Sequence, residues 1–294
     1  MRKSGKWKWL AFVLTGIILL IAAAYFIFIS KFREILTAVI EKESKGQYTF
    51  NASKVKLSLW DQKITLNDVT VSPLDSISSS ADYFVSAEKV YLSVESLRDV
   101  MFRDKLVVND IIINEPFFRI RVHMDKPREN EEFHPSTVTD IINNLTQRLQ
   151  VKSLSIKNAS FEYNSYKYPD PFKGNNINLS ISNFRKKDSL TNDLMYTDDI
   201  DLSITDQSWK FPGGNQDLEF KRLHYSAKDQ FIQIDTSTLI VRGRNSADTV
   251  TLYADQFRFS PRRLQEHLAN DEFVVDSLVC IKPQLVLHKG DNQY

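Results

Sequence analysis

The sequence repeats one hydrophobic pattern at three places along the chain. Each copy begins with Ala-x-x-Val-x-Leu, and the three copies start at Ala52, Ala87 and Ala247. Each is followed by a second run that ends at a proline, namely Leu66-Asn67-Asp68-Val69 before Pro73, Val108-Asn109-Asp110-Ile111 before Pro116, and Val275-Asp276-Ser277-Leu278 before Pro283. A short unit of this kind cannot bury its apolar side chains alone. The repetition therefore predicts an elongated sheet of stacked units rather than one compact catalytic domain.

Within each copy, apolar and polar residues alternate, which is typical of a strand with one apolar and one polar face. The Asn-Asp or Asp-Ser pair interrupts the alternation once, and the same step recurs at Lys157-Asn158 and at Lys221-Arg222. A β-bulge or a sharp bend at each pair would keep the apolar side chains on one face and would curl the sheet.

The alternation predicts a mainly β fold class. In full, we expect an N-terminal transmembrane helix followed by an elongated, curled, repeating β-sheet groove with short helical inserts. Strands are expected at residues 50–60, 63–71, 84–94, 106–113, 117–123, 151–163, 176–183, 199–205, 217–225, 231–241, 249–259, 272–281 and 284–288. Helices are expected at 96–102, at 135–149 and at 260–268, where Pro261 would occupy the first turn.

The N-terminus has the pattern of a membrane anchor. Residues 1–9 carry four basic and no acidic residues, and residues 10–29 form an apolar run long enough to cross a bilayer. The basic flank favours a cytoplasmic N-terminus, with Trp7 and Trp9 at the membrane interface and the rest of the chain on the far side. The alternative is a signal peptide cleaved near residues 22–24. Cleavage there would leave the apolar residues 25–29 as a new N-terminus, which favours the uncleaved anchor.

Residues 31–46 are expected to form an amphipathic helix that ends at Gly46. Its apolar stripe consists of Phe32, Ile35, Leu36, Val39 and Ile40. This helix could lie on the membrane surface, plug the end of the sheet, or continue the anchor while packed on the body. The predicted organisation is therefore a cytoplasmic segment (1–9), an anchor (10–29), the amphipathic helix (31–46) and one periplasmic repeating β-sheet body (47–294).

Composition and motifs point away from catalysis. The net charge of +1 provides no field that would favour nucleic acid, and the chain contains no glycine-rich phosphate loop, HExxH or GxSxG motif. The acidic residues at 198–201 and at 125–132 lack EF-hand spacing and are interpreted as solvated loop charge. Cys280 is the single cysteine and is expected to be a small core residue. We predict no enzymatic activity, no cofactor and no metal site. A membrane-tethered carbohydrate-active enzyme would need a pair of carboxylates in a cleft, which the sequence does not identify.

The order of these parts resembles the N-terminal part of the AsmA-like family, the relatives of TamB. The parts that carry the resemblance are the anchor, the helix, Gly46, the strand at 55–59, Leu66-Asn67-Asp68-Val69, Ala87-x-x-Val90-x-Leu92 and the run from Ile111 to Phe118. The run from Val151 to Tyr163 also looks like a strand pair of this family. The resemblance implies an inner-membrane protein of a diderm bacterium with a periplasmic β-groove, linked to phospholipid movement and outer-membrane homeostasis. Because family members are often much longer, it also implies a short or truncated member.

The leading hypothesis is an apolar groove that binds or transfers phospholipid, since each methylene removed from water contributes about 0.8 kcal/mol without any catalytic residue. Phospholipid and the inner membrane are the expected partners, other envelope proteins are further candidates, and nucleic acid is not expected. The candidate lining residues are Val55, Leu57, Leu59, Val90, Leu92, Val94, Ile111, Ile113, Val250, Leu252, Leu278 and Cys280. The alternative is a membrane-anchored structural or interaction module of envelope assembly, whose apolar faces close as a sandwich. The two hypotheses differ in whether the apolar side of residues 55–59, 90–94 and 250–252 is open.

Overall fold

The structure is a computed structural model of the whole chain. It describes residues 48–58, 60–74, 81–103, 107–122, 151–166, 170–184, 199–211, 214–243, 248–261 and 274–290, together with residues 197 and 264 and part of the region 15–46.

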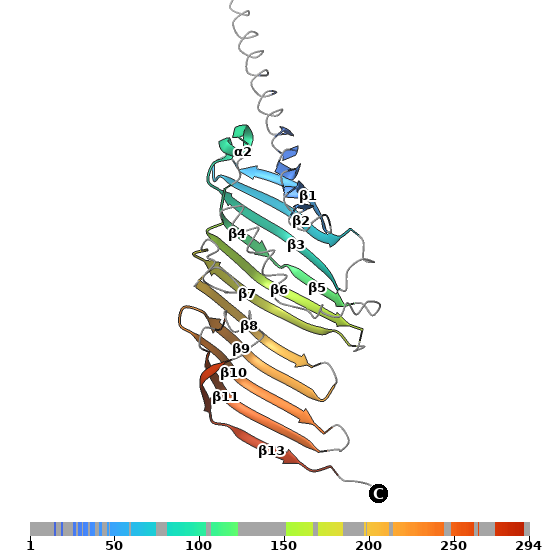
Figure 1. Cartoon of the computed structure of the whole chain (residues 1–294), viewed down its shortest axis with the longest axis vertical. Coiled ribbons are helices and arrows are strands. Elements are labelled where there is room, and N and C mark those ends of the chain that lie inside the picture. The colour runs from blue at the N-terminus through green and yellow to red at the C-terminus, as the bar shows by residue number, and fades with distance from the viewer. Residues whose placement is uncertain are drawn as a thin grey trace, which may run out of the picture.

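The described part of the chain is mainly β and forms one sheet of thirteen strands. Along the sheet the order is β1-β2-β3-β4-β6-β7-β8-β9-β10-β11-β12, with β5 continuing β4 and β13 continuing β12 (Figure 1). All pairs are antiparallel except those of β4 and β5 with β6. The strands are β1 (Tyr48–Ser58), β2 (Lys63–Pro73), β3 (Ala81–Val94), β4 (Val108–Asn114), β5 (Phe117–Val122), β6 (Ser153–Ser165), β7 (Phe172–Ser182), β8 (Asp199–Lys210), β9 (Gln216–Ser226), β10 (Phe231–Arg242), β11 (Thr249–Pro261), β12 (Val275–Ile281) and β13 (Gln284–His288).

All thirteen expected strands are present, so the predicted mainly β class is confirmed. The helix expected at 96–102 is α2 (Leu97–Arg103), and the Asp99 N–H donates to Ser96 Oγ at 3.1 Å as an N-terminal cap. The helix expected to begin at Ser260 is wrong at its start. Ser260 and Pro261 are instead the last residues of β11, where a proline is tolerated because the ladder ends there. The helix expected at 135–149 lies outside the described residues.

One bend line crosses the whole sheet, and we call it the crease. In each strand, or end-to-end strand pair, the inward-facing positions advance by two residues on either side of the crease and by three at it. Examples are the steps from Ile156 to Ala159 in β6 and from Ile234 to Ser237 in β10. Residues with positive φ mark the crease on most strands: Asp68, Glu115, Asn158, Asn176, Asp206, Thr236 and Lys282. The three-residue step keeps the apolar side chains on the same face of both halves.

The crease lies in register from strand to strand. Ala52 pairs with Val69, which pairs with Ala87, and Ser237 pairs with Ala254 further along the sheet. Most buried residues along this line are small, namely Ala52, Val69, Ala87, Pro116, Ala159, Gly174, Ser237 and Ala254. The larger exceptions are Gln207 and Phe220. Small residues suit the inner side of a bend, where neighbouring side chains converge.

Gly174 shows how tight the crease is. A Cβ atom at this position would lie 2.3 Å from Cε1 of Phe161, which is its partner on β6. The Phe161 ring therefore occupies the space that a side chain would need, and any larger residue at position 174 would have to displace this ring.

The predicted break at the Asn-Asp and Asp-Ser pairs is confirmed, but it takes two forms. Asn67-Asp68 lies at the crease, where Asp68 adopts φ 49° without an extra residue in the ladder. Asn109-Asp110 instead makes a β-bulge against the end of β3, and Asp276-Ser277 makes the same bulge against the end of β11. The first copy of the pattern is thus not structurally equivalent to the other two.

Two units of the sheet are true structural repeats. Leu92 pairs with Ile111 in the first unit and Phe259 pairs with Leu278 in the second, so both strands are offset by the same 167 residues. This offset places Ala254, not Ala247, at the position of Ala87. The third Ala-x-x-Val-x-Leu motif is therefore wrong as a structural match, and Ala247 itself lies outside the described residues. The match of the prolines Pro116 and Pro283 is confirmed.

The N-terminal segment packs against the start of the sheet. Those residues of 15–42 that the structure describes are helical, and Phe32 and Leu36 are buried against the apolar side chains of β1 to β4. Arg33 Nη2 donates to the Ala52 carbonyl at 3.0 Å. Gly46, at φ 76°, donates its N–H to the Glu41 carbonyl at 2.7 Å and ends the helix as expected. Among the described residues, no helix is both long and apolar enough to cross a membrane. The expected anchor at 10–29 lies mostly outside them.

Candidate functional site

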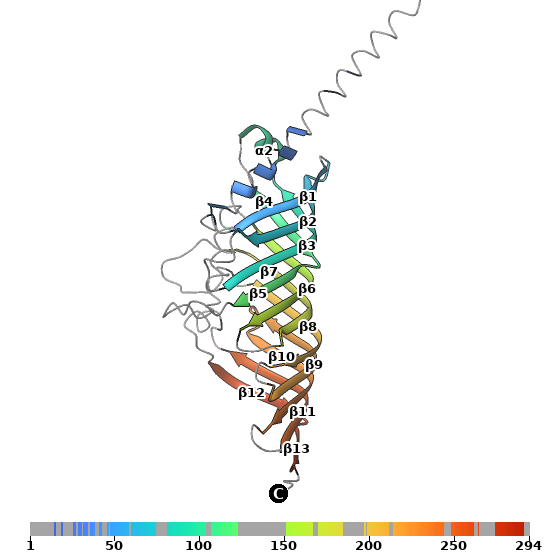
Figure 2. The same cartoon turned by 90° about the vertical axis from the view of Figure 1, so that its right-hand side faces the viewer.

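The apolar face of the sheet is the concave one. Figure 2 shows the strands bowed, with the helical segments that precede β1 on their hollow side. Phe32 and Leu36 from those segments belong to one buried cluster with Ala52, Val55 and Ile64, so the apolar face is the hollow one. A second cluster, around Leu154, Ile181 and Ile200, continues the same face toward the middle of the sheet.

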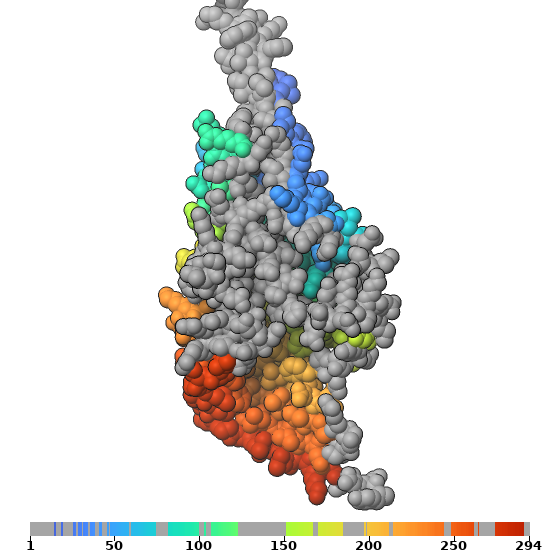
Figure 3. Space-filling view, viewed as in Figure 1, coloured from blue at the N-terminus to red at the C-terminus, as the bar shows by residue number. Residues whose placement is uncertain are grey.

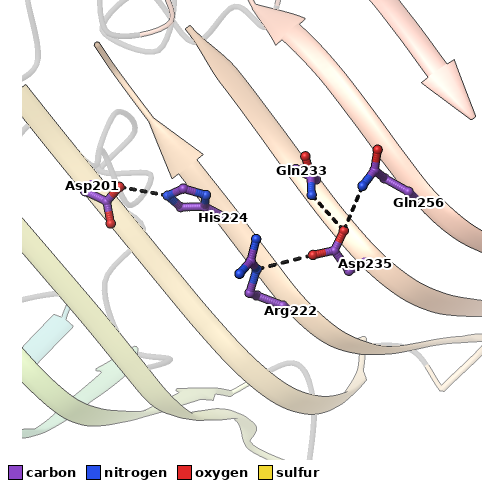
Figure 4. Close-up of polar contacts among 6 residues, drawn as sticks. All are labelled: Asp201, Arg222, His224, Gln233, Asp235 and Gln256. Atoms are coloured by element: carbon purple, nitrogen blue, oxygen red, sulfur yellow. Dashed lines mark hydrogen bonds and ion pairs between the residues drawn. The ribbon is translucent and has the colours of Figure 1, made fainter. Parts of the chain in front are cut away.

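The opposite face carries polar cross-strand pairs (Figure 4). His224 Nε2 lies 2.7 Å from Asp201 Oδ2, and Arg222 Nε lies 3.2 Å from Asp235 Oδ2. The other oxygen of Asp235 accepts from Gln233 at 2.8 Å and from Gln256 at 3.1 Å. These contacts link β8 to β11 on the outer side, so the two faces of the sheet differ sharply in chemistry.

At the N-terminal end, the apolar face is covered. Phe32 is fully buried, and Leu97 from α2 and Val151 from the approach to β6 belong to the same cluster. The predicted lining residues Val55, Val90, Leu92 and Val94 are buried in this cluster, and Leu57, Ile111 and Ile113 pack against it. This end is a conventional hydrophobic core.

Among the described residues, the same face is more exposed at the C-terminal end. Val250 and Leu252 are half-buried, while Leu278, Leu285 and Leu287 are 59%, 63% and 70% exposed. In Figure 3 the residues of β8 to β13 form a hollowed surface in the lower part of the molecule. Cys280 is half-buried on β12 rather than in a core. Leu59, Trp7 and Trp9 lie outside the described residues.

An aromatic cluster lines one wall of the concave face between these two ends, and sequence reasoning missed it. Trp209 lies with its ring centre 4.9 Å from that of Phe220 and 5.5 Å from that of Phe172, which in turn contacts Phe161 and Phe211. Two features of the sequence could have indicated it. Trp209 and Phe211 are two residues apart and so share a strand face, and the preceding strand begins with Phe172. Such rings provide a large apolar surface at a low entropy cost.

One buried amide lies beside the aromatic cluster, and its polar atoms are satisfied. Gln207 Nε2 donates to the carbonyl oxygens of Asn175 and Thr205, both at 2.6 Å, and its Oε1 accepts from Trp209 Nε1 at 3.0 Å. Because these hydrogen bonds are internal, Gln207 leaves the surrounding surface apolar.

The acidic residues near the start of β8 have polar partners on neighbouring strands. Asp199 and Asp201, interpreted from sequence as loop charge, are strand residues of β8, which corrects that interpretation. Asp199 accepts from Ser182 Oγ at 2.7 Å, and Asp201 contacts His224. No group of three histidine, cysteine or acidic residues that could hold a metal ion occurs among the described residues.

Comparison of the sequence with models of protein families and with curated proteins gives no match. The resemblance to the AsmA-like family therefore rests on the order of its parts alone.

Proposed function

We propose that the concave apolar face binds phospholipid acyl chains and that the protein serves phospholipid transport in a bacterial envelope, as an AsmA-like protein anchored in the inner membrane. The observation that carries this proposal is the continuous apolar face, which is covered at the helical end and most exposed on β12 and β13. An open face with Leu252, Leu278 and Leu287 gives an acyl chain both a surface and an entrance.

The dimensions are compatible with such a ligand. The sheet has eleven strand positions, which at about 4.8 Å each give a length of roughly 50 Å. One leaflet of a bilayer core is roughly 15 Å thick, so a single acyl chain would span only part of the face. Sheltering eight methylenes would contribute at most about 6 kcal/mol at about 0.8 kcal/mol each.

The crease supports this function because it gives the face two walls. Side chains on the two halves of each strand point toward the same hollow, and the Phe172 and Trp209 rings lie on one wall. The charged side chains of Arg222 and Asp235 lie on the outer side, away from the proposed ligand.

The alternative of a closed interaction module fits only the N-terminal end. A sandwich would require the inner faces to cover one another along the whole sheet, whereas Leu285 and Leu287 remain mostly exposed. The C-terminal end therefore favours the lipid-binding proposal over the closed module.

The test is native mass spectrometry of the full chain purified in mild detergent, with extraction and identification of retained lipid. The inner-face variant is Leu252→Asp with Leu287→Asp. Its matched control is Tyr253→Asp with Val286→Asp, which changes the adjacent, outward-facing positions of the same two strands. We expect the wild type and the control to retain phospholipid and the inner-face variant to lose it, with circular dichroism showing that all three are folded.

Two outcomes would overturn the proposal. One is a folded wild-type chain without lipid, and the other is equal lipid retention by the inner-face and outer-face variants. Either would favour the interaction module.

A further inference from the structure

The C-terminal edge of the sheet is apolar and unpaired within the part of the chain that the structure describes. β12 and β13 pair with β11, and no described strand lies on their other side. Leu278, Leu285 and Leu287 are exposed on the inner face, and Val279 and Ile281 are exposed on the outer face. A strand edge of this kind is a template for a further strand.

The internal repeat shows what covers such an edge. In the first structural unit, which comprises β3 to β5, β6 lies on the edge of β4 and β5 and runs parallel to them. Ile111 is beside Leu154, Ile113 is beside Ile156, and Phe118 is beside Phe161. Shifted by the repeat offset, the positions that meet β6 become Leu278, Cys280 and Leu285.

Backbone hydrogen bonds hold β6 in this register on both sides of the crease. The Glu115 N–H donates to the Lys157 carbonyl at 2.8 Å, and the Ser160 N–H donates to the Pro116 carbonyl at 2.9 Å. The equivalent groups in the second copy belong to Lys282 and Pro283. Lys282 has φ 48° and Glu115 has φ 50°, so the two copies present these groups in the same way.

We propose that the outer edge of β12 and β13 binds an extended segment of a partner protein, which adds to the sheet as a parallel strand with the apolar pattern of β6. That pattern is alternate apolar residues with one three-residue step, so that both halves of the segment extend the concave face. This inference rests on the repeat and not on lipid binding.

A second copy of the chain fits the outer edge of β12 and β13 less well than such a segment. The edge that it would offer is β1, at the opposite end of the sheet beside the helical segment (Figure 1). Lys54 and Lys56 are exposed on β1, and charged side chains on an edge strand oppose further pairing.

Cys280 allows a test that reads the register, because it is the only cysteine of the chain. The probe is a peptide of residues 152–165 with Ile156→Cys, activated as a mixed disulfide with 2-thiopyridine. The Cys280 thiolate attacks the peptide sulfur, a protein–peptide disulfide forms, and 2-thiopyridine leaves and is measured by its absorbance. The full-length chain is used, with a Cys280→Ser variant to measure background release.

We expect the Ile156→Cys peptide to couple at least tenfold faster than two controls. The first control peptide carries the activated cysteine at Lys157→Cys, a position that faces the other side of the strand. The second control has the probe sequence in reverse order, with the activated cysteine between the same two neighbours. Leu285→Lys with Leu287→Lys in the full chain should remove the preference, since it changes the edge without changing Cys280.

Equal coupling by all three peptides would overturn the proposal. Concentration-dependent dimers of the full chain, seen by light scattering and lost in the same Leu285→Lys and Leu287→Lys variant, would assign the edge to a second copy and also overturn it. If the wild-type chain retains no phospholipid but still couples selectively to the Ile156→Cys peptide, only the proposed lipid-binding function is refuted.

Discussion

The two copies of the structural repeat have the same strands but opposite surroundings. Leu92 of β3 is 5% exposed, whereas its counterpart in β11, Phe259, is half-buried. Phe118 and Ile120 of β5 are half-buried, whereas their counterparts Leu285 and Leu287 are among the most exposed apolar residues described. Alternation along a strand therefore specifies which face is apolar, but it does not specify what covers that face.

The covering groups come from outside the repeated strands. Phe32 and Leu36 precede the sheet, Leu97 lies in α2, and Val151 precedes β6. The first unit is a core because these four side chains reach it. In the second unit, Leu264 is the counterpart of Leu97 at the same offset, and it is helical but only half-buried.

The largest expected effect is the difference in unfolding free energy when a charge is introduced at the closed end and at the exposed end of the sheet. Leu92→Asp should lower the free energy of unfolding by at least about 4 kcal/mol, because it places an unpaired carboxylate in a closed core. Leu287→Asp should change it by no more than about 0.5 kcal/mol, since this side chain is exposed. Urea unfolding of the full chain, followed by circular dichroism, measures both. Similar losses for the two variants would show that the ends do not differ as described.

Removing the helix side chain should have the next largest effect. Phe32→Ala should cost about 3 to 5 kcal/mol in unfolding free energy, because it leaves a cavity under a fully buried ring. Hydrogen exchange should then rise in β1 to β3 and remain unchanged in β9 to β11. Glu34→Ala, an exposed position of the same helical segment, is the control. A uniform rise in exchange along the sheet would argue against a locally closed end.

The smallest effect concerns Tyr48, at the closed end. Burial raises the pKa of its phenol to about 12, and the Tyr83 N–H donates to its oxygen at 3.3 Å. Because the folded state holds this proton more tightly than the unfolded state, the stabilisation is complete below about pH 10 and is lost as the pH rises toward 12. Tyr48→Phe should flatten that alkaline loss in urea unfolding, whereas Tyr253→Phe in β11 is the control. An unchanged alkaline profile in Tyr48→Phe would contradict burial of this phenol.

Much of the fold could be predicted from sequence because its determinants are local. Two-residue alternation identified every strand, and the paired polar residues at Asn67-Asp68 and Lys157-Asn158 revealed the crease. The repeat offset was harder to find, because the Ala-x-x-Val-x-Leu motif at Ala247 matches in letters but lies seven residues from the structural equivalent at Ala254. A hydrophobic alternation matches itself at several shifts, and only strand pairing selects among them.

The sequence predicted which face of the sheet the candidate lining residues occupy, but it did not predict which of them are covered. The chosen residues of β1, β3, β4, β11 and β12 all lie on the apolar side, yet Leu92 belongs to a core and Leu278 faces open space. Leu92 shares a buried cluster with Phe32, which is far away in sequence and belongs to another element. The aromatic contacts of Trp209 with Phe172 and Phe220 likewise depend on the pairing of β7, β8 and β9.

The crease also divides each strand into two halves, and each half has its own inward and outward alternation of side chains. Across β6 and β7 the pairing shifts by one residue at the crease and then returns, so the two halves of this ladder share one register. A single-residue insertion in one half of β10 would invert the side chains beyond it but would leave the other half in phase. Two-residue insertions would preserve both halves, so the walls of this sheet can lengthen independently, and only in even steps.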